Sequence, residues 1–460
     1  MKTMKAFLMA WWFLALTAVP GVYAKKPVTP LPLDSLKHQI VQLEQEIQDL
    51  KDGSFTADTM MTSVQKAFQD LLQSQIQDLS DKVNSVSDAQ KKVLPGEFNP
   101  AIGVVGEEIT SYNTKGMNEN GSGRPGGIDV DLRSVELNVA SSIDPFVKGY
   151  AVVNASADPQ TGEATWGVEE AALQTTALPL NLELKAGRFF GEFGRLSDIH
   201  DHELPMIYRP LALDQYVGGE SHSDGFQVNW LVPIPQYLSL TAGAGDRFGG
   251  DIQENSIGNF RNFSELNYWA RLSSYFDLTP DWQAEMGVSG LFNPSTDSLN
   301  GIPTMVNDSL IEKERRLAGV DFSLKWAPLR NNQFQSLTWG NEVLYSDNRY
   351  VGTLPGNNTT LVDTSIGALG LYSYLTWKFS REWSVSFLVN WVENQQVATY
   401  RTTQYSPYIT WALSHWNQLR LEYTHTENTD DQARGLADND ELSLQWQWII
   451  GAHSHGWQQR

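Results

Sequence analysis

The residue types best suited to binding a metal ion gather in one stretch of the sequence, from Arg195 to Ser221 and just beyond. His200 and His202 are two positions apart, so in an extended segment both imidazoles face the same side. Paired imidazoles suit zinc or another metal of borderline softness. We therefore predict that the protein requires no cofactor and that this stretch is a candidate zinc site. The candidate ligands are His200 and His202, with further ligands from Glu203, Asp214, His222 and Asp224. The alternative is a polar loop that happens to contain histidines.

Catalysis and nucleic-acid binding have little support in the composition. The chain has no cysteine, which excludes a disulfide scaffold, an iron–sulfur cluster and a cysteine nucleophile. The run Gly287-Val288-Ser289-Gly290 lacks the spacing of a nucleophile elbow. The 54 acidic residues against 33 basic ones give a formal charge of −21, whereas a nucleic-acid-binding surface would be basic. We predict a protein that is not an enzyme and has no nucleic-acid partner.

Two N-terminal segments precede the region that holds the histidines. Residues 1–24 have the pattern of a signal peptide, with two lysines, an apolar run and small residues at the cleavage position. Residues 25–96 are predicted to form a short periplasmic α-helical coiled coil, because apolar residues recur there at heptad spacing. These helices either assemble copies of the chain or fold as an intrachain hairpin. Residues 34–93 are also the candidate contact for a periplasmic partner.

From Phe98 onward the apolar pattern changes to a period of two, which is typical of β-strands. Phe226, Val228 and Trp230 alternate with Gln227 and Asn229, for example. A soluble β-sandwich would alternate in the same way. Two features favour a membrane barrel over residues 97–460 instead. The segments are longer than strands of soluble proteins, and many end in tryptophan, which suits a lipid–water boundary.

The spacing of turn residues predicts the strand count. Seven tight turns, such as Thr279-Pro280-Asp281 and Ser414-His415, alternate with eight longer polar loops. Fifteen connections imply about 16 antiparallel strands. Short turns on one side and long loops on the other are typical of outer-membrane barrels. The fold class is therefore mainly β, a porin-like transmembrane barrel preceded by the helical segment.

Several runs of the barrel region stand in a fixed order along the chain. They are Phe98-Asn99-Pro100-Ala101-Ile102, Val168-Glu169-Glu170-Ala171, Leu184-Lys185-Ala186-Gly187-Arg188-Phe189-Phe190, His200-Asp201-His202, Tyr208-Arg209, Asp224-Gly225-Phe226-Gln227-Val228 and Ile450-Gly451-Ala452-His453-Ser454-His455-Gly456. Together these runs resemble one family, the plugless outer-membrane β-barrel proteins of Gram-negative bacteria labelled zinc-regulated and TonB-dependent receptor-like. The resemblance covers about residues 98–457, and a preceding coiled coil is usual in that family. It implies an outer-membrane barrel linked to metal supply.

The sequence argues against the energised transport that a TonB-dependent receptor performs. Such a receptor holds a folded plug inside a barrel of about 22 strands. The segment before this barrel is short and its pattern is helical, so it leaves no room for a plug. Passive diffusion through an open lumen is the expectation for about 16 strands. The loop from Arg195 to Ser221 would make the lumen attract cations if it folds inward, because it is rich in carboxylates.

The sequence thus predicts an outer-membrane porin-like channel for passive diffusion of small solutes, with a preference for cations and a link to zinc or other metal uptake. The alternative is a structural envelope tether or partner-binding outer-membrane protein with a closed lumen. Expected partners are outer-membrane lipid and further copies of the chain, in a homotrimer or another homo-oligomer. The N-terminal helices would lie in the periplasm.

Overall fold

The structure is a computed structural model that describes most of the chain after residue 99. The described residues are 100–116, 119, 124–157, 162–249, 263–294, 310–329, 334–353, 361–396, 399–429 and 436–451. The signal peptide predicted over residues 1–24 and the helical segment predicted over residues 25–96 lie outside them. No helix among the described residues has both the length and the apolar character needed to cross a membrane.

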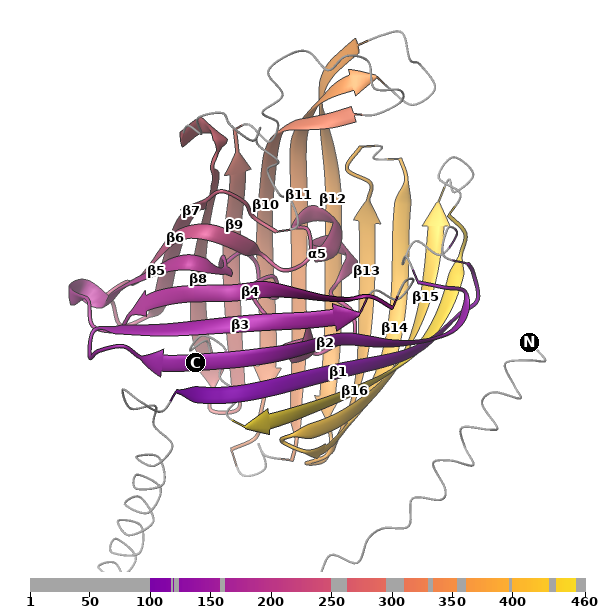
Figure 1. The fold of residues 1–460 in the computed structure, drawn as a ribbon, viewed down its shortest axis with the longest axis horizontal. Coiled ribbons are helices and arrows are strands. Elements are labelled where there is room, and N and C mark those ends of the chain that lie inside the picture. Colours follow the sequence, from indigo (N-terminus) through magenta and orange to yellow (C-terminus); the bar gives the residue numbers. More distant parts are fainter. Residues whose placement is uncertain are drawn as a thin grey trace, which may run out of the picture. The chain divides into compact units, whose positions relative to one another are not determined.

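Within these residues, sixteen antiparallel strands pair in chain order and form a closed barrel (Figure 1). β1 closes the ring by pairing with β16, from Gly103 with Gly451 to Asn113 with Glu441. The predicted 16-stranded barrel is confirmed. The strands are β1 (Ala101–Asn113), β2 (Gly127–Ser142), β3 (Val147–Ala157), β4 (Ala164–Thr175), β5 (Leu182–Phe190), β6 (His222–Leu231), β7 (Tyr237–Gly245), β8 (Asn267–Thr279), β9 (Trp282–Asn293), β10 (Leu310–Trp326), β11 (Ser336–Thr353), β12 (Leu361–Lys378), β13 (Trp383–Glu393), β14 (Arg401–Ser414), β15 (Asn417–Thr429) and β16 (Asn439–Gly451).

Side chains alternate between the outer surface and the interior of the barrel. On β6, Phe226 is 65% exposed whereas Gln227 is 1% exposed. On β10, Val320 is exposed and Asp321 is buried. Since successive side chains of a strand point to opposite faces, the outer surface is apolar and the interior carries charges and amides. That arrangement suits lipid outside and a polar lumen inside.

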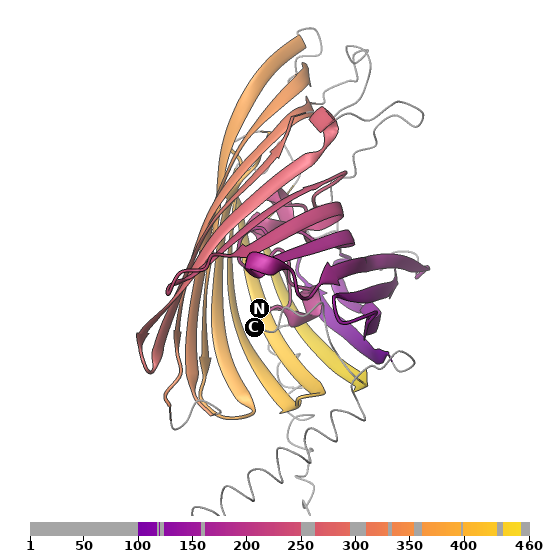
Figure 2. The same ribbon diagram turned by 90° about the vertical axis from the view of Figure 1, so that its left-hand side faces the viewer.

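The barrel wall differs in height around its circumference. Strands β10–β12 have 17–18 residues, whereas β5–β7 have only 9–10. Figure 2 shows the long strands forming one tall wall and the short strands lying opposite. The connection between β5 and β6, residues 191–221, is the longest in the barrel. Because its two flanking strands are short, it leaves the wall below the rim of the tall side.

A β-bulge in β2 directs an arginine into the lumen. Glu107 of β1 pairs with Ser134, and Glu108 pairs with Leu132, which leaves Arg133 as an extra residue between them. A bulge re-aims the side chain that it carries. Arg133 points inward and forms ion pairs there, although the apolar Leu132 beside it is exposed on the outer surface.

A second bulge, in β4, places two consecutive glutamates in the lumen. Val152 of β3 pairs with Glu170, and Val153 pairs with Val168, so Glu169 is the extra residue. Strict alternation would send one of these carboxylates into the membrane. Instead both Glu169 and Glu170 are buried, and both face the segment that connects β5 and β6.

Candidate functional site

The connection between β5 and β6 crosses the lumen and is bonded to strands around the barrel. We call residues 191–221 the lumen loop; the sequence predicted a loop over 195–221. The loop contains a short 3-10 helix, η2 (Asp201–Glu203), and a one-and-a-half-turn helix, α5 (Leu211–Tyr216). Helix α5 packs against β11, β12 and β13, on the far side from β5 (Figure 1). The loop therefore folds inward rather than away from the barrel.

Polar bonds join the lumen loop to the opposite wall. The backbone N–H of Ile207 donates to Glu422 of β15 at 2.9 Å, and the hydroxyl of Tyr208 donates to Glu441 of β16 at 2.7 Å. Arg195 forms an ion pair with Glu285 of β9. These strands are distant from β5 around the ring, so the loop is held from several directions.

An apolar core also fixes the lumen loop. Phe193, Met206, Leu213 and Tyr216 of the loop are fully buried. They belong to one cluster with wall residues that include Trp269. Burying a large apolar side chain stabilises by about 1.5–3 kcal/mol. The loop is thus a packed element of the structure and narrows the lumen at a defined position.

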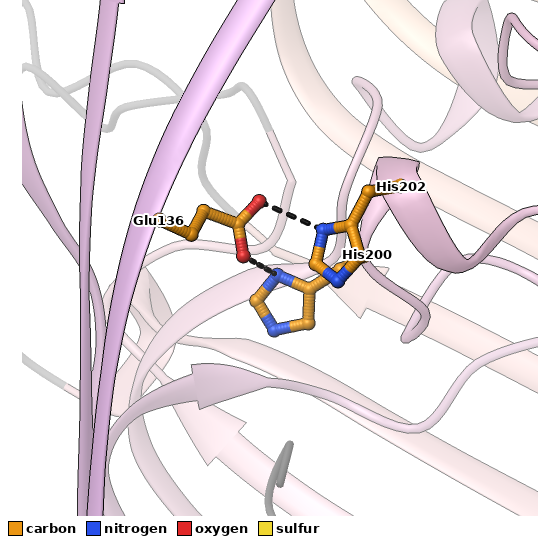
Figure 3. Close-up of side chains that lie close together, drawn as sticks. All are labelled: Glu136, His200 and His202. Atoms are coloured by element: carbon orange, nitrogen blue, oxygen red, sulfur yellow. Dashed lines mark hydrogen bonds and ion pairs between the residues drawn. The ribbon is translucent and has the colours of Figure 1, made fainter. Parts of the chain in front are cut away.

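The two histidines predicted as metal ligands lie side by side within this loop, against a glutamate of β2 (Figure 3). His202 Nδ1 lies 3.0 Å from Glu136 Oε1, and His200 Nδ1 lies 3.5 Å from Glu136 Oε2. The two imidazole rings have centroids 5.5 Å apart. His200, His202 and Glu136 are 2%, 1% and 2% exposed. The sequence placed the histidines together, but it gave no sign of Glu136.

The bulged strand β4 supplies the other partners of His200. Its Nε2 lies 2.9 Å from Glu170 Oε1, and its Nδ1 lies 3.6 Å from Glu169 Oε1. Glu170 also accepts hydrogen bonds from the hydroxyl of Tyr150, at 3.0 Å, and from the backbone N–H of Phe190. The strand wall therefore holds His200 on both ring nitrogens.

His222, a third predicted ligand, belongs to a neighbouring group. It lies with Glu169 and Glu220 in a second cluster of candidate ligand atoms. The ring of Phe190 separates it from the first pair, since its centroid is 4.5 Å from both His200 and His222. The structure thus brings His222 near the histidine pair: the two groups are linked by Glu169, whose Oε1 also lies 3.6 Å from His200 Nδ1, but the second group does not include Glu136 or His202.

The remaining three predicted ligands are not brought to the histidine pair. Glu203 and Asp214 are exposed side chains of the lumen loop. Asp224 pairs with Arg188, at 2.6 Å, and with Arg247. These two guanidinium groups take up its charge, and it belongs to neither group of candidate ligand atoms among the described residues. Closeness in sequence to His222 therefore did not mean closeness to the ligand cluster.

The carboxylates govern the charge of the loop histidines. Burial lowers the pKa of His200, but Glu136, Glu169 and Glu170 more than offset it and hold that pKa well above its usual value. The pKa of His202 is raised for the same reason, chiefly by Glu136 against the effect of burial. Burial and nearby acids raise the pKa of the Glu220 carboxyl well above its usual range. Because carboxylates outnumber cationic side chains in the cluster, these three groups bind protons more readily than they would in water.

A cavity of about 520 Å³ remains between the lumen loop and strands β13–β16. Its wall is polar over most of its extent, with Asn390, Gln404 and Thr426 among the uncharged groups. The titratable residues that line it are Arg124, Arg133, Asp201, Tyr208, Arg209, Asp214, Glu220, His222, Glu422 and Glu441. Such a lining suits small hydrated solutes rather than an apolar ligand.

Comparison with known proteins supports the fold. No family model matches the chain. A protein of Aquifex aeolicus, described as uncharacterized, is 26% identical over 356 residues, which cover 70% of this chain and 69% of that protein. Pseudomonas putida OprB has a TM-score of 0.51 at 11% identity, covering 76% of this chain and 94% of its own.

The outer-membrane channel DcaP of Acinetobacter baumannii has a TM-score of 0.50 at 10% identity, and the match covers 76% of this chain and 97% of DcaP. None of these three proteins is described as zinc-regulated or TonB-dependent, so that part of the resemblance stays a prediction. The sixteen closed strands and these likenesses together give the conclusion on fold. The chain has the fold of a porin-like outer-membrane β-barrel.

Proposed function

We propose that this protein is an outer-membrane channel for passive diffusion of small solutes. The observation that carries the proposal is the lumen loop, which crosses a closed 16-stranded barrel and leaves a polar cavity beside it. A barrel of this size encloses more space than its own side chains fill. A packed loop within it sets the size and charge of what passes. If the protein were instead a structural envelope tether with a closed lumen, the lumen loop would have to fill the lumen. The polar cavity beside the loop does not favour that alternative.

We further propose that the channel prefers cations. Among the charged residues that the structure describes as buried, nine are carboxylates and six are lysine or arginine. The cavity lining has a weaker bias of the same sign, with four carboxylates besides Glu220, whose raised pKa favours the neutral acid, against three arginines. Fixed negative charge in a narrow, low-dielectric passage raises the local concentration of cations. The link to zinc supply is part of this proposal, since divalent cations respond most strongly to such a field.

The assembly is also a proposal. The apolar outer surface of the strands supports contact with outer-membrane lipid. We propose that the chain forms a homotrimer or another homo-oligomer, with residues 34–93 in the periplasm as the contact for other copies or for a periplasmic partner. The heptad spacing of the apolar residues in that segment supports this. Chemical crosslinking of the full chain, with and without those residues, distinguishes an assembly made by the helices from one made by the barrel.

Liposome swelling tests the channel. Liposomes that contain the purified, folded protein are diluted into isosmotic sugars of increasing size, with protein-free liposomes as the control. The proposal predicts rapid swelling in a pentose and slower swelling in a trisaccharide, because the lumen loop restricts the passage. Absence of swelling in the pentose, with protein shown to be folded and inserted, contradicts the channel and favours the tether.

A further inference from the structure

Three buried carboxylates of β2 and β4, from Glu136, Glu169 and Glu170, lie against the histidine pair of the lumen loop. We propose that Glu136, His200 and His202 bind one zinc-like divalent cation, with Glu169 at the fourth position, and that this ion fixes the lumen loop to the wall. The binding site stands on its own geometry, whereas its effect on conduction rests on the proposed channel function. The ion would regulate the constriction and would not be the cargo.

The distances fit a tetrahedral ion. Zinc binds histidine nitrogen and carboxylate oxygen at about 2.0–2.2 Å, which sets neighbouring donor atoms about 3.4 Å apart. His200 Nδ1 lies 3.5 Å from Glu136 Oε2 and 3.6 Å from Glu169 Oε1. The candidate ligand atoms of Glu136, His200 and His202 all lie within 4.8 Å of one another. Glu169 approaches this group through His200 and also belongs to the neighbouring group with Glu220 and His222, so it would have to turn toward the ion to become the fourth ligand.

Glu170 supplies the supporting contact that metal-binding histidines usually have. A ligating imidazole typically gives its other N–H to a carboxylate, which fixes the ring and its tautomer. His200 Nε2 lies 2.9 Å from Glu170 Oε1, so the proton belongs on Nε2 and Nδ1 faces Glu136 and Glu169. The hydroxyl of Tyr150 orients Glu170 in turn. The bulge in β4 makes this possible, because it brings Glu169 and Glu170 to the same side.

Buried oxygens point to a missing cation. Glu136 Oε2 and Glu169 Oε2 have no hydrogen-bond partner among the described residues, and Glu136 is 2% exposed. An unsatisfied buried carboxylate oxygen is destabilising, since it has lost the hydrogen bonds that water would give it. A divalent ion would compensate Glu136 and Glu169 together. The mixed nitrogen and oxygen ligands favour zinc over magnesium or calcium, which prefer oxygen alone.

The position of the cluster separates it from the route that a solute would take. The cavity beside the lumen loop is lined by Asp201, Glu220 and His222, but Glu136, His200 and His202 do not reach it. The histidine pair lies on the other side of the loop, between the loop and β2–β4. An ion there is enclosed by protein. It would therefore hold the lumen loop against β2–β4, a role that we call the latch.

Zinc binding by the full chain in detergent tests the site. The protein is stripped with a chelator and titrated with Zn²⁺ against a chromophoric competitor, and Co²⁺ replaces zinc to report the coordination geometry by its absorption. We expect one ion per chain and a tetrahedral cobalt spectrum. Glu136→Gln and His202→Ala should abolish tight binding, while Glu170→Gln should weaken it about 10–100-fold, as loss of a supporting carboxylate does.

His425→Ala is the matched control, because His425 pairs with Asp440 at the long-loop end of β15 and β16, away from the cluster. It should bind zinc like the wild type. Heat-modifiable migration on gels verifies that each variant is folded, and Glu136→Gln keeps the shape of the side chain if His202→Ala does not fold. Absence of zinc binding by the wild type, or equal binding by folded Glu136→Gln and His202→Ala, overturns the site.

The latch has a separate readout. Limited proteolysis within residues 191–221 should slow when zinc is added to the wild type and should not change in Glu136→Gln. Equal cleavage with and without zinc overturns the latch. If the protein binds zinc but gives no conductance, the proposed channel function is wrong and the proposed zinc site stands. If it conducts but does not bind zinc, only the proposed zinc site is wrong.

Discussion

The backbone N–H of Ile207, at the turn of the lumen loop, donates to Glu422 Oε2 of β15 at 2.9 Å. The two residues are 215 positions apart in the chain. Met206, beside Ile207, accepts a bond from Arg420 of the same strand at 2.7 Å. These contacts show that the lumen loop, which leaves the wall between β5 and β6, reaches β15, next to the β16–β1 pair that closes the barrel. A constriction built in this way depends on a few tethers, and each can be tested.

Replacing Glu422 should loosen the far end of the loop. Glu422→Ala removes the acceptor for Ile207, so we expect larger current fluctuations and a higher mean conductance in single-channel recordings. Glu422→Gln removes the charge but keeps an amide oxygen that accepts the same bond, so its fluctuations should stay near those of the wild type. If the two variants behave alike, the tether is not what holds the loop.

Removing negative charge from the cavity should weaken cation preference. Asp214 is exposed to the cavity on α5, so Asp214→Asn removes its charge at little structural cost. A unit charge at about 4 Å contributes about 1 kcal/mol in water, which limits the loss to about fivefold in local cation concentration. The reversal potential in a KCl gradient should move toward zero. Asp277→Asn is the control, because Asp277 is exposed near the short-turn end of β8 and does not line the cavity; it should leave the potential unchanged.

The start of the lumen loop depends on a glycine. Gly194 has φ of +60°, and an added methyl group would collide with Glu342 of β11. A left-handed residue other than glycine costs about 1–2 kcal/mol, and the collision adds to this. Gly194→Ala should therefore lower the temperature at which the barrel loses its folded migration on gels. Gly290→Ala meets open space and should migrate like the wild type. Equal stability of both variants would contradict the packing described for the loop.

Replacing Arg133, the arginine at the bulge of β2, should lower the stability of the barrel more than replacing the exposed Arg316. Arg133 binds Asp201 of the lumen loop and lies 3.2 Å from Glu107. Arg133→Ala leaves the fully buried Glu107 without its cationic partner, whereas Asp201 keeps its ion pair with Arg209; loss of one partner from a buried pair costs about 3–5 kcal/mol. Arg316 forms exposed pairs that solvent screens, so Arg316→Ala should change stability little. Urea unfolding in lipid vesicles measures both. Similar losses for the two variants would show that Arg133 does not anchor the loop.

The strand count could be predicted because it depends on local rules. Alternation of apolar and polar residues marks each strand, and turn residues such as Pro280 and Asp281 mark where it ends. The length of the segment between β5 and β6 also identified the loop that folds inward. The sequence could not decide whether this loop folds into the lumen. Apolar residues such as Met206 and Leu213 indicate that the loop packs against something, but they do not show which surface it packs against.

The partners of the histidines could not be predicted for a different reason. Glu136 lies on a regular part of β2, and nothing local distinguishes it from other inward carboxylates. Glu169 and Glu170 break the alternation, and a bulge is the only way to bury both; two adjacent acids within an otherwise alternating strand could have suggested it. Asp224 was grouped with the ligands because it follows His222 closely, but its partners are Arg188 and Arg247, and no local pattern shows that pairing.

Single-channel conductance in planar bilayers tests the central claim most directly. The purified, folded protein is added to bilayers in KCl, and a salt gradient gives the sign of the selectivity. The account predicts stable current steps with a reversal potential that shows cation preference, and Glu422→Ala should change their size or noise. A silent bilayer, with folded protein shown to be inserted, would contradict the channel and leave the barrel as a closed envelope tether.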